Sequence, residues 1–238
     1  MHVVFDPKAD CPSILDITDA NVDDAQIGRT IAIEPGASYV FDKGYCHYGW
    51  WTAIADKGAL FVTRPKTTMR LDIVGERPIA RAYGDGFTVL EDHEVRFASK
   101  GDSQLPIRLR RLRVQRTDGK TITLLTNDLA RAAVDIATLY KARWQIELLF
   151  RWIKQHLRIK AFYGTSQNAV RTQVWIAISV YVLVAIVRKR LNLERSLHSI
   201  LQILSVSLFE KIPILQALSQ PQCDEMNYLS SKQLILFD

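Results

Sequence analysis

Tyr140-Lys-Ala-Arg-Trp-Gln-Ile-Glu-Leu-Leu-Phe-Arg-Trp-Ile-Lys154 is the stretch from which the fold can be deduced. Its apolar and charged residues recur with helical spacing, which predicts a helix over about residues 139–157. A turn of about 100° per residue then groups four polar side chains on one face: Arg143, Glu147, Arg151 and Lys154. Most apolar residues spread over the opposite side. The helix is therefore expected to present a cationic stripe with one carboxylate, backed by a face that packs in the core.

This stripe allows two interpretations. Glu147 is four residues from both Arg143 and Arg151, so the stripe could be a salt-bridged surface, with each pair contributing about 0.3–0.5 kcal/mol. Alternatively, the cations could hold phosphates around a metal-binding carboxylate. The charge balance favours the second interpretation, because Glu147 is the only acid between residues 141 and 160. The cations in that range are Lys141, Arg143, Arg151, Lys154, Arg158 and Lys160.

Residues 1–50 alternate strand-like and helix-like signals, which argues for an α/β sheet. The apolar run at residues 38–41 reads as a buried strand that stops at Asp42. Lys43-Gly44-Tyr45 then turns away from the strand.

Residues 51–126 are expected to form a β-rich insertion between the α/β parts. Asp118-Gly119 separates two strand-like runs and is a strong hairpin signal. Five arginines crowd the first strand of that hairpin: Arg108, Arg110, Arg111, Arg113 and Arg116. They could protect a solvated edge strand or form a rib that contacts phosphates, and the sequence alone does not choose.

Residues 127–220 are expected to be helical, and residues 221–238 a tail. Asn127 or Asp128 could cap a helix that starts at Leu129. The apolar run at residues 174–187 has 14 residues, which is shorter than the roughly 18 of a membrane-spanning helix. We therefore expect a buried core helix there and no membrane partner.

The composition is that of an ordinary globular protein. The chain has 238 residues, 48% hydrophobic and 24% charged, which is enough to bury a substantial core. Its net charge of +6 favours a polyanionic partner. Three widely spaced cysteines exclude a disulfide scaffold and a cysteine-type zinc site, and they suit a reducing, cytosolic compartment.

The spacing of Tyr140, Arg143, Glu147 and Lys154 resembles the Tyr-Arg-Glu-Lys signature of transposases from the IS4 group of insertion sequences. The segment that ends in Asp42-Lys43-Gly44-Tyr45 resembles that group's strand-ending aspartate motif. Further segments also resemble the family, namely residues 61–64, 126–128 and 164–166. The resemblance thus extends over nearly the whole chain.

The resemblance implies a ribonuclease-H-like core of the DDE class, which cleaves and joins phosphodiesters at transposon ends. Asp42 and Glu147 would then be catalytic ligands of Mg²⁺ or Mn²⁺. Tyr140, Arg143 and Lys154 would grip DNA phosphates, and Arg151 would add to this DNA-binding surface. Trp144 is expected to pack in the core, with stacking on a displaced base as the alternative.

The resemblance also implies a bacterial protein that is cytoplasmic and associated with the nucleoid, and that forms a homo-oligomer on DNA in the full-length family. The family's first catalytic Asp would lie upstream of residue 2. We therefore expect a truncated and inactive copy. The alternative is a non-catalytic DNA-binding or regulatory remnant, and a structure-specific nuclease on the same fold is a third reading.

Overall fold

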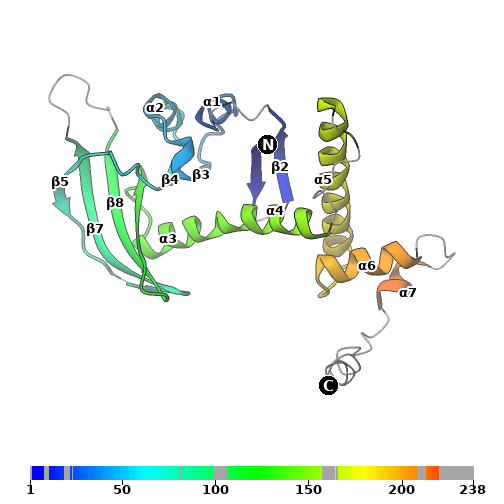
Figure 1. Cartoon of the computed structure of the whole chain (residues 1–238). Helices are drawn as coiled ribbons and strands as arrows, with labels where there is room; N and C mark the ends of the chain where they lie inside the picture. Colours follow the sequence, from blue (N-terminus) through cyan, green and yellow to red (C-terminus); the bar gives the residue numbers. More distant parts are fainter. Residues whose placement is uncertain are drawn as a thin grey trace, which may run out of the picture. The chain divides into compact units, whose positions relative to one another are not determined.

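The computed structural model describes residues 2–7, 11–18, 22, 24–80, 82–98, 107–156, 164, 166–207 and 213–219 (Figure 1). It divides into two compact units, residues 1–151 and residues 152–238. The architecture is mixed α/β, which confirms the predicted fold class. The domain boundaries predicted at residues 50, 126 and 220 stay predictions.

A sheet of seven strands dominates the first unit. The strand order is β3-β4-β9-β8-β7-β5, with β6 paired to β7. β3 and β4 are parallel and the other pairs are antiparallel. The bounds are β3 (Ser38–Val40), β4 (Leu60–Thr63), β5 (Leu71–Glu76), β6 (Tyr83–Gly84), β7 (Phe87–Phe97), β8 (Leu109–Arg116) and β9 (Thr121–Thr126). The strands of the β-rich stretch are thus continuous with the strand that precedes Asp42.

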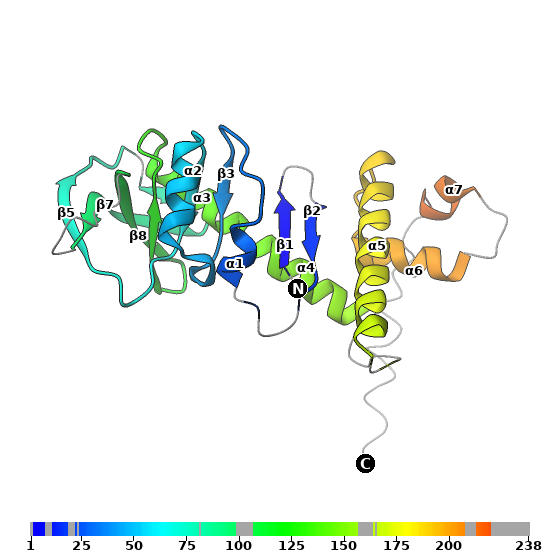
Figure 2. The same cartoon turned by 90° about the horizontal axis from the view of Figure 1, so that it is seen from above.

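Two helices pack against this sheet through separate apolar cores (Figures 1 and 2). Helix α2 (Tyr48–Asp56) buries Trp50, Trp51 and Ile54 with Phe61. The Trp51 and Phe61 rings stack with centroids 5.0 Å apart. Helix α3 (Ala133–Ala142) packs against residues such as Val62 and Leu112. Since Phe61 and Val62 are neighbours on β4, strand alternation directs them to opposite faces, and each face receives one helix.

Two local features of the first unit are visible only in the structure. Helix α2 is capped by His47, whose Nδ1 accepts a hydrogen bond from the Trp50 amide (3.3 Å). β7 is one continuous strand with a bulge between Val89 and Glu91. The bulge inserts an extra residue and locally interrupts the pairing with the neighbouring strand.

The interpretation of the arginine-rich strand as an edge strand is wrong. β8 lies inside the sheet, between β7 and β9. Its side chains Leu109, Leu112 and Val114 are buried. An interior strand has no free backbone edge to protect, so its arginines need a different explanation.

The helix that carries the signature is interrupted at Arg143. α3 ends at Ala142, and α4 (Trp144–His156) follows. At the junction, the Arg143 amide donates to the Tyr140 carbonyl (3.1 Å), three residues back instead of four. Such a tightened turn departs from the roughly 100° per residue of an α-helix, so one continuous helical wheel over residues 139–157 is an approximation.

The start of α3 also differs from the prediction. The helix begins at Ala133 and not at Leu129. Asp128 Oδ1 instead accepts hydrogen bonds from the amides of Ala130 and Arg131, both at 3.0 Å. Asn127 does not cap the helix, because its side chain bonds to the main chain of β4.

The N-terminal segment forms a small sheet of its own. β1 (His2–Asp6) and β2 (Cys11–Asp16) pair antiparallel as a two-stranded sheet. Helix α1 (Asp24–Gly28) follows, and the short 3-10 helix η1 (Lys43–Tyr45) comes directly after Asp42.

The second unit contains α5 (Gln167–Arg190), α6 (Leu197–Ser207) and α7 (Ile214–Ser219). Its core joins Val184, Ile200 and Leu218. Only one face of α5 is buried, so the prediction of a buried helix holds for that face alone; Ile176 and Leu183 on the other face are 59% and 60% exposed. Within the described residues, α5 alone is long and apolar enough to cross a membrane, a test that core helices of soluble proteins also pass. The predicted tail, residues 221–238, lies outside the described residues.

Candidate active site

Asp42 lies where the sequence predicts, directly after the end of a strand. Phe41 extends the pairing of β3, because its amide donates to the Val62 carbonyl (3.1 Å). Asp42 then takes the N-cap position of η1 with an extended backbone, but its side chain makes no capping hydrogen bond. Among the described residues, its Oδ1 atom is buried without any hydrogen-bond partner. A buried carboxylate oxygen without a donor is costly, which points to a role other than capping.

Arg143 and Glu147 form a direct ion pair. Nη2 of Arg143 donates to Oε1 of Glu147 at 2.8 Å, and the two side chains are 20% and 38% exposed. Their spacing of four residues across the α3–α4 junction brings them to the same side. The predicted pairing of Glu147 with Arg143 is therefore present.

Asp42 belongs to the same electrostatic cluster. Burial lowers the pKa of Arg143, but the hydrogen bond to Glu147 and the charges of Glu147 and Asp42 outweigh it, so the pKa is raised. Burial is the main cause of the raised pKa of Tyr140. The charge of Arg143 lowers this pKa, and the charge of Asp42 raises it further. The Asp42 carboxylate thus acts on two of the signature residues. A strand end and a helix that are about 100 residues apart in the sequence converge here.

Tyr140 is buried and lies beside Arg143. The guanidinium carbon of Arg143 is 5.7 Å from the centroid of the Tyr140 ring, which is a cation–π distance. Tyr140 is also part of the core between α3 and the sheet. The residue therefore anchors the end of α3 in addition to facing the cluster.

Trp144 does not pack in the core, so that prediction is wrong. Its side chain is 47% exposed, and so is that of Leu148, at 45%. Arg151 lies over the Trp144 ring, with its guanidinium carbon 5.8 Å from the centroid. The cause is the wheel position of Trp144, which falls beside the polar stripe, whereas Leu149 and Ile153 turn inward and are buried.

Lys154 is exposed on the part of α4 that belongs to the second unit. Its place relative to the cluster in the first unit is not defined.

Cys46 and Arg64 are not among the predicted site residues, although Arg64 belongs to the family-like segment 61–64. Cys46 is buried, and its Sγ lies 3.3 Å from the Arg64 carbonyl and 3.5 Å from Oγ1 of Thr63. Burial raises the pKa of the Cys46 thiol, and the negative charge of Asp42 contributes in the same direction. The charge of Arg64 lowers the pKa of Tyr140. Arg64 therefore adds a second cation near the signature residues.

Asp42 and Glu147 are the residues that would hold a divalent ion. Both offer only oxygen donors, and among the described residues the buried Oδ1 atom of Asp42 has no hydrogen-bond partner. Mg²⁺ is typically held by one or two carboxylates together with waters and substrate phosphates. The described part of the chain contains no group of three or more His, Cys, Asp or Glu residues placed to hold a metal.

The five arginines at residues 108–116 all have carboxylate partners. Arg110 forms two hydrogen bonds to the buried Asp92. The remaining pairs are Arg108 with Glu94, Arg111 and Arg113 with Glu91, and Arg116 with Asp118. The register between β7 and β8 produces all of these pairs except the last, and the pairing weakens the interpretation of the arginines as a free phosphate-binding rib.

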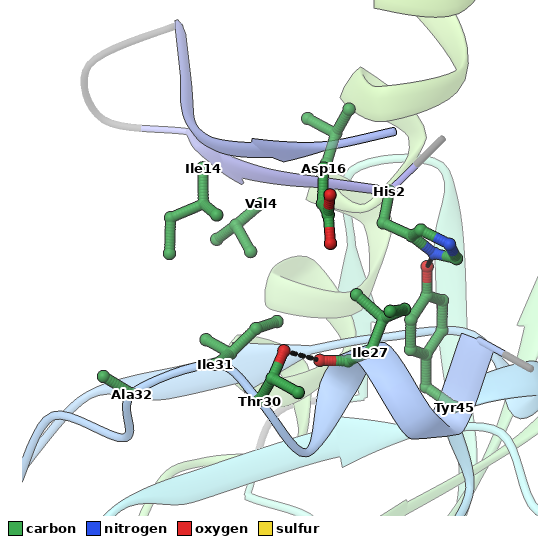
Figure 3. A pocket seen from close by; sticks show the side chains of 10 residues that line it. His2, Val4, Ile14, Asp16, Ile27, Thr30, Ile31, Ala32 and Tyr45 are labelled. Atoms are coloured by element: carbon green, nitrogen blue, oxygen red, sulfur yellow. Dashed lines mark hydrogen bonds between the residues drawn. The ribbon is translucent and has the colours of Figure 1, made fainter. Parts of the chain in front are cut away.

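A cavity of about 270 Å³ lies elsewhere in the first unit, between the β1–β2 hairpin and the segment from α1 to η1 (Figure 3). Its lining is largely apolar, with Val4, Ile14, Ile27 and Ile31. Nδ1 of His2 lies 3.3 Å from the Tyr45 hydroxyl at its border (Figure 3). Neither Asp42 nor Glu147 lines it, so this cavity is separate from the carboxylate cluster.

Comparisons with known proteins identify the family. A family model described as a transposase DDE domain matches residues 1–183. A Sinorhizobium fredii protein, named provisionally as the transposase y4zB, is 68% identical over 192 residues, covering 81% of this chain and 54% of that protein. A Geobacillus stearothermophilus protein, named with similar reserve as the transposase for insertion sequence element IS5377, is 27% identical over 183 residues, covering 77% and 48%. The chain thus spans about half the length of these relatives.

Proposed function

The chain belongs to the transposase DDE domain family, and from this premise we propose that it carries two of the metal-binding carboxylates, Asp42 and Glu147, of a DNA-cleaving and DNA-joining active site. The observation that supports this most is that the charges of Asp42 and Glu147 both act on Arg143. The buried oxygen of Asp42 that lacks a partner is the atom this role would explain.

Mg²⁺ or Mn²⁺ bound there would activate a water or a 3′-hydroxyl and stabilise the leaving oxygen during attack on phosphorus. The residues of the chain do the rest. Arg143 orients Glu147 in the free protein through their 2.8 Å hydrogen bond. On DNA, Arg143 and Arg64 would bind phosphate oxygens, because guanidinium groups match their geometry. Lys154 would contribute a further point charge from α4.

DNA is the proposed partner, which would place the protein in the bacterial cytoplasm on the nucleoid. Phosphate contacts of this kind give affinity that falls with salt and carries little sequence preference. The exposed pair of Trp144 and Arg151 would add a surface on which an unpaired base can stack. Assembly into a homo-oligomer on DNA is a further part of the proposal.

Manganese binding tests the carboxylates. Electron paramagnetic resonance titration of the chain with Mn²⁺ should show a site whose affinity drops about tenfold or more in Asp42→Asn and in Glu147→Gln, since even outer partners of a metal typically contribute tenfold or more. Asp56→Asn removes an exposed acid at the end of α2 and serves as the matched control. Equal Mn²⁺ affinity in all four proteins would refute the proposed site.

A cleavage assay on transposon-end DNA with Mg²⁺ or Mn²⁺ tests the reaction. The second candidate function is a non-catalytic DNA-binding or regulatory protein, which the absence of a three-residue acidic or metal-ligating group in the described residues favours. That function predicts salt-dependent DNA binding without cleavage. Strand cleavage that disappears in Asp42→Asn would decide for the enzyme.

A further inference from the structure

The segment between β9 and α3 is fixed by two arginines that come from other strands. Residues 127–132 connect the sheet to the helix that ends in Tyr140 and Arg143. Ala132, at the N-cap position of α3, provides no side-chain cap. Carbonyl groups in such a connection need donors from elsewhere, because the segment has no regular backbone pairing of its own.

Arg110 provides the first of these donors. Its Nη1 atom donates to the carbonyl of Arg131 at 2.7 Å and to that of Asp128 at 3.2 Å. Its Nε and Nη2 atoms donate to the two oxygens of Asp92 at 2.7 and 2.6 Å. The Arg110 and Asp92 side chains are only 3% and 1% exposed, so the guanidinium is held in one orientation.

Arg77 provides the second donor, from the residue that follows β5. Its Nη2 atom donates to the carbonyl of Leu129 at 2.7 Å, and its Nη1 atom donates to Glu94 Oε1 at the same distance. Its backbone amide also donates to the Asp92 carbonyl at 2.9 Å. Three backbone carbonyls, those of Asp128, Leu129 and Arg131, thus accept hydrogen bonds from the guanidinium groups of two arginines. Two carboxylates on β7, Asp92 and Glu94, orient these guanidinium groups.

We propose that Arg77 and Arg110 are positioning residues of the candidate active site, which they align through the 128–131 segment and α3. This inference rests on the proposed function, because it concerns the placement of Tyr140, Arg143 and Glu147. α3 runs for 10 residues, or about 15 Å at 1.5 Å per residue. A tilt of about 5° at its start would therefore move its far end by about 1 Å, an error that can cost an enzyme about a hundredfold in rate.

The arrangement also links the β-rich stretch to the site. Asp92 and Glu94 lie on β7 and Arg110 on β8, two adjacent strands of the sheet. A change in these two strands would reach α3 through the guanidinium groups of Arg77 and Arg110. The paired arginines of β8 thus gain a function that does not require them to touch DNA.

The test uses Arg110→Lys and Arg77→Gln in the whole chain. Lys keeps the charge beside Asp92 but loses the planar fork that reaches two carbonyls and one carboxylate together. Arg77 is 27% exposed, so its replacement keeps the buried Arg110–Asp92 pair and should fold. Arg111→Lys is the matched control, since Arg111 pairs with Glu91 on the same strands and does not contact the 128–131 segment.

Hydrogen exchange read residue by residue is the primary measurement. We expect exchange of the amides of residues 130–142 to rise about tenfold in both test variants, with the amides of β8 and β9 unchanged and the control unaffected. Unchanged exchange over residues 130–142, or an equal rise throughout the sheet, would overturn the inference.

Manganese affinity separates this inference from the proposed function. If the site is real, Mn²⁺ affinity that depends on Asp42 should fall about tenfold in the two test variants and stay unchanged in the control. If the unsubstituted chain shows no Mn²⁺ binding that depends on Asp42, the proposed function fails, and the exchange pattern still decides whether the two arginines position α3. Unchanged Mn²⁺ affinity together with raised exchange would overturn the positioning role.

Discussion

Asn127→Ala should destabilise the first unit by more than an ordinary surface substitution does. Oδ1 of Asn127 accepts the Phe61 amide at 2.8 Å, and Nδ2 donates to the Ala59 carbonyl at 3.0 Å. The side chain therefore acts as one more backbone link between β9 and β4. That link matters because the two strands pair directly only at Val62 with Thr126 and at Thr63 with Leu125.

The magnitude follows from what the alanine would leave behind. Ala59 and Phe61 are 1% and 0% exposed, so water would not easily replace the lost partners. Leaving one buried donor and one buried acceptor unpaired costs about 1–3 kcal/mol each, and some relaxation is expected, so we predict a loss of about 2–4 kcal/mol. For a unit of this size, that corresponds to a fall in melting temperature of roughly 5–15 °C.

Urea unfolding followed by tryptophan fluorescence measures this loss. Trp50 and Trp51 pack with Phe61 and report on the first unit, provided that the three other tryptophans, Trp144, Trp152 and Trp175, are replaced by Phe in the parent and in every variant. Asn127→Asp keeps the acceptor for Phe61 but loses the donor to Ala59, so it should lose part of the same stability. Asn168→Ala, at an exposed position of α5, should lose none.

The reasoning would be refuted if Asn127→Ala unfolded within about 0.5 kcal/mol of the parent, which is the range of ordinary surface substitutions. Equal stability of Asn127→Asp and the parent would refute the role of the donated hydrogen bond to Ala59.

Three further predictions concern other parts of the first unit. Arg110→Met should lose about 3–5 kcal/mol in urea unfolding because the buried Asp92 loses both short hydrogen bonds from Arg110 and keeps, among the described residues, only Arg77 at 3.9 Å. The double variant Asp92→Leu/Arg110→Met should lose less, and a larger loss in the double variant would contradict this. Burial is the main cause of the raised pKa of Cys46, so its thiol should stay unlabelled by iodoacetamide at about pH 8 while the partly exposed Cys11 reacts, as mass spectrometry after labelling would show. The same shift should lower the free energy of unfolding only as the pH rises through the ordinary thiol pKa of 9.0, which unfolding at several pH values checks. Trp144→Ala should leave the melting temperature unchanged and lower single-strand DNA affinity about tenfold, measured by fluorescence anisotropy; unchanged affinity would exclude base stacking on Trp144.

Much of the site could be predicted from the sequence because it depends on short local patterns. A strand that stops at Asp42 and a helix with Arg143 and Glu147 four residues apart are both visible in the residue order. The pairing of Arg143 with Glu147 follows from helical spacing alone. The charge of Asp42 raises the pKa of Tyr140 and of Arg143, which lie about 100 residues away in the sequence. The sequence predicts this interaction only through the family resemblance, because no local pattern connects the two segments.

The predictions that failed concern positions where the neighbours in space decide. The arginine-rich strand β8 resembles a charged edge strand in the sequence, yet in the fold β7 supplies the carboxylate partners of Arg108, Arg110, Arg111 and Arg113. Trp144 is expected in the core because it is large and apolar, but its helical position lies next to Arg151 and about 140° from the buried Leu149.

The sequence by itself determined the alternation of strands and helices, the hairpin at Asp118-Gly119 and the cationic stripe around Glu147, because turn preferences and helical periodicity act between residues that are close along the chain. Only the tertiary structure decided that Arg110 is buried against Asp92 and that Asn127 bonds to β4 rather than capping α3. These choices depend on which backbone groups would otherwise stay unpaired in the interior, and a chain can satisfy them only after distant strands have met.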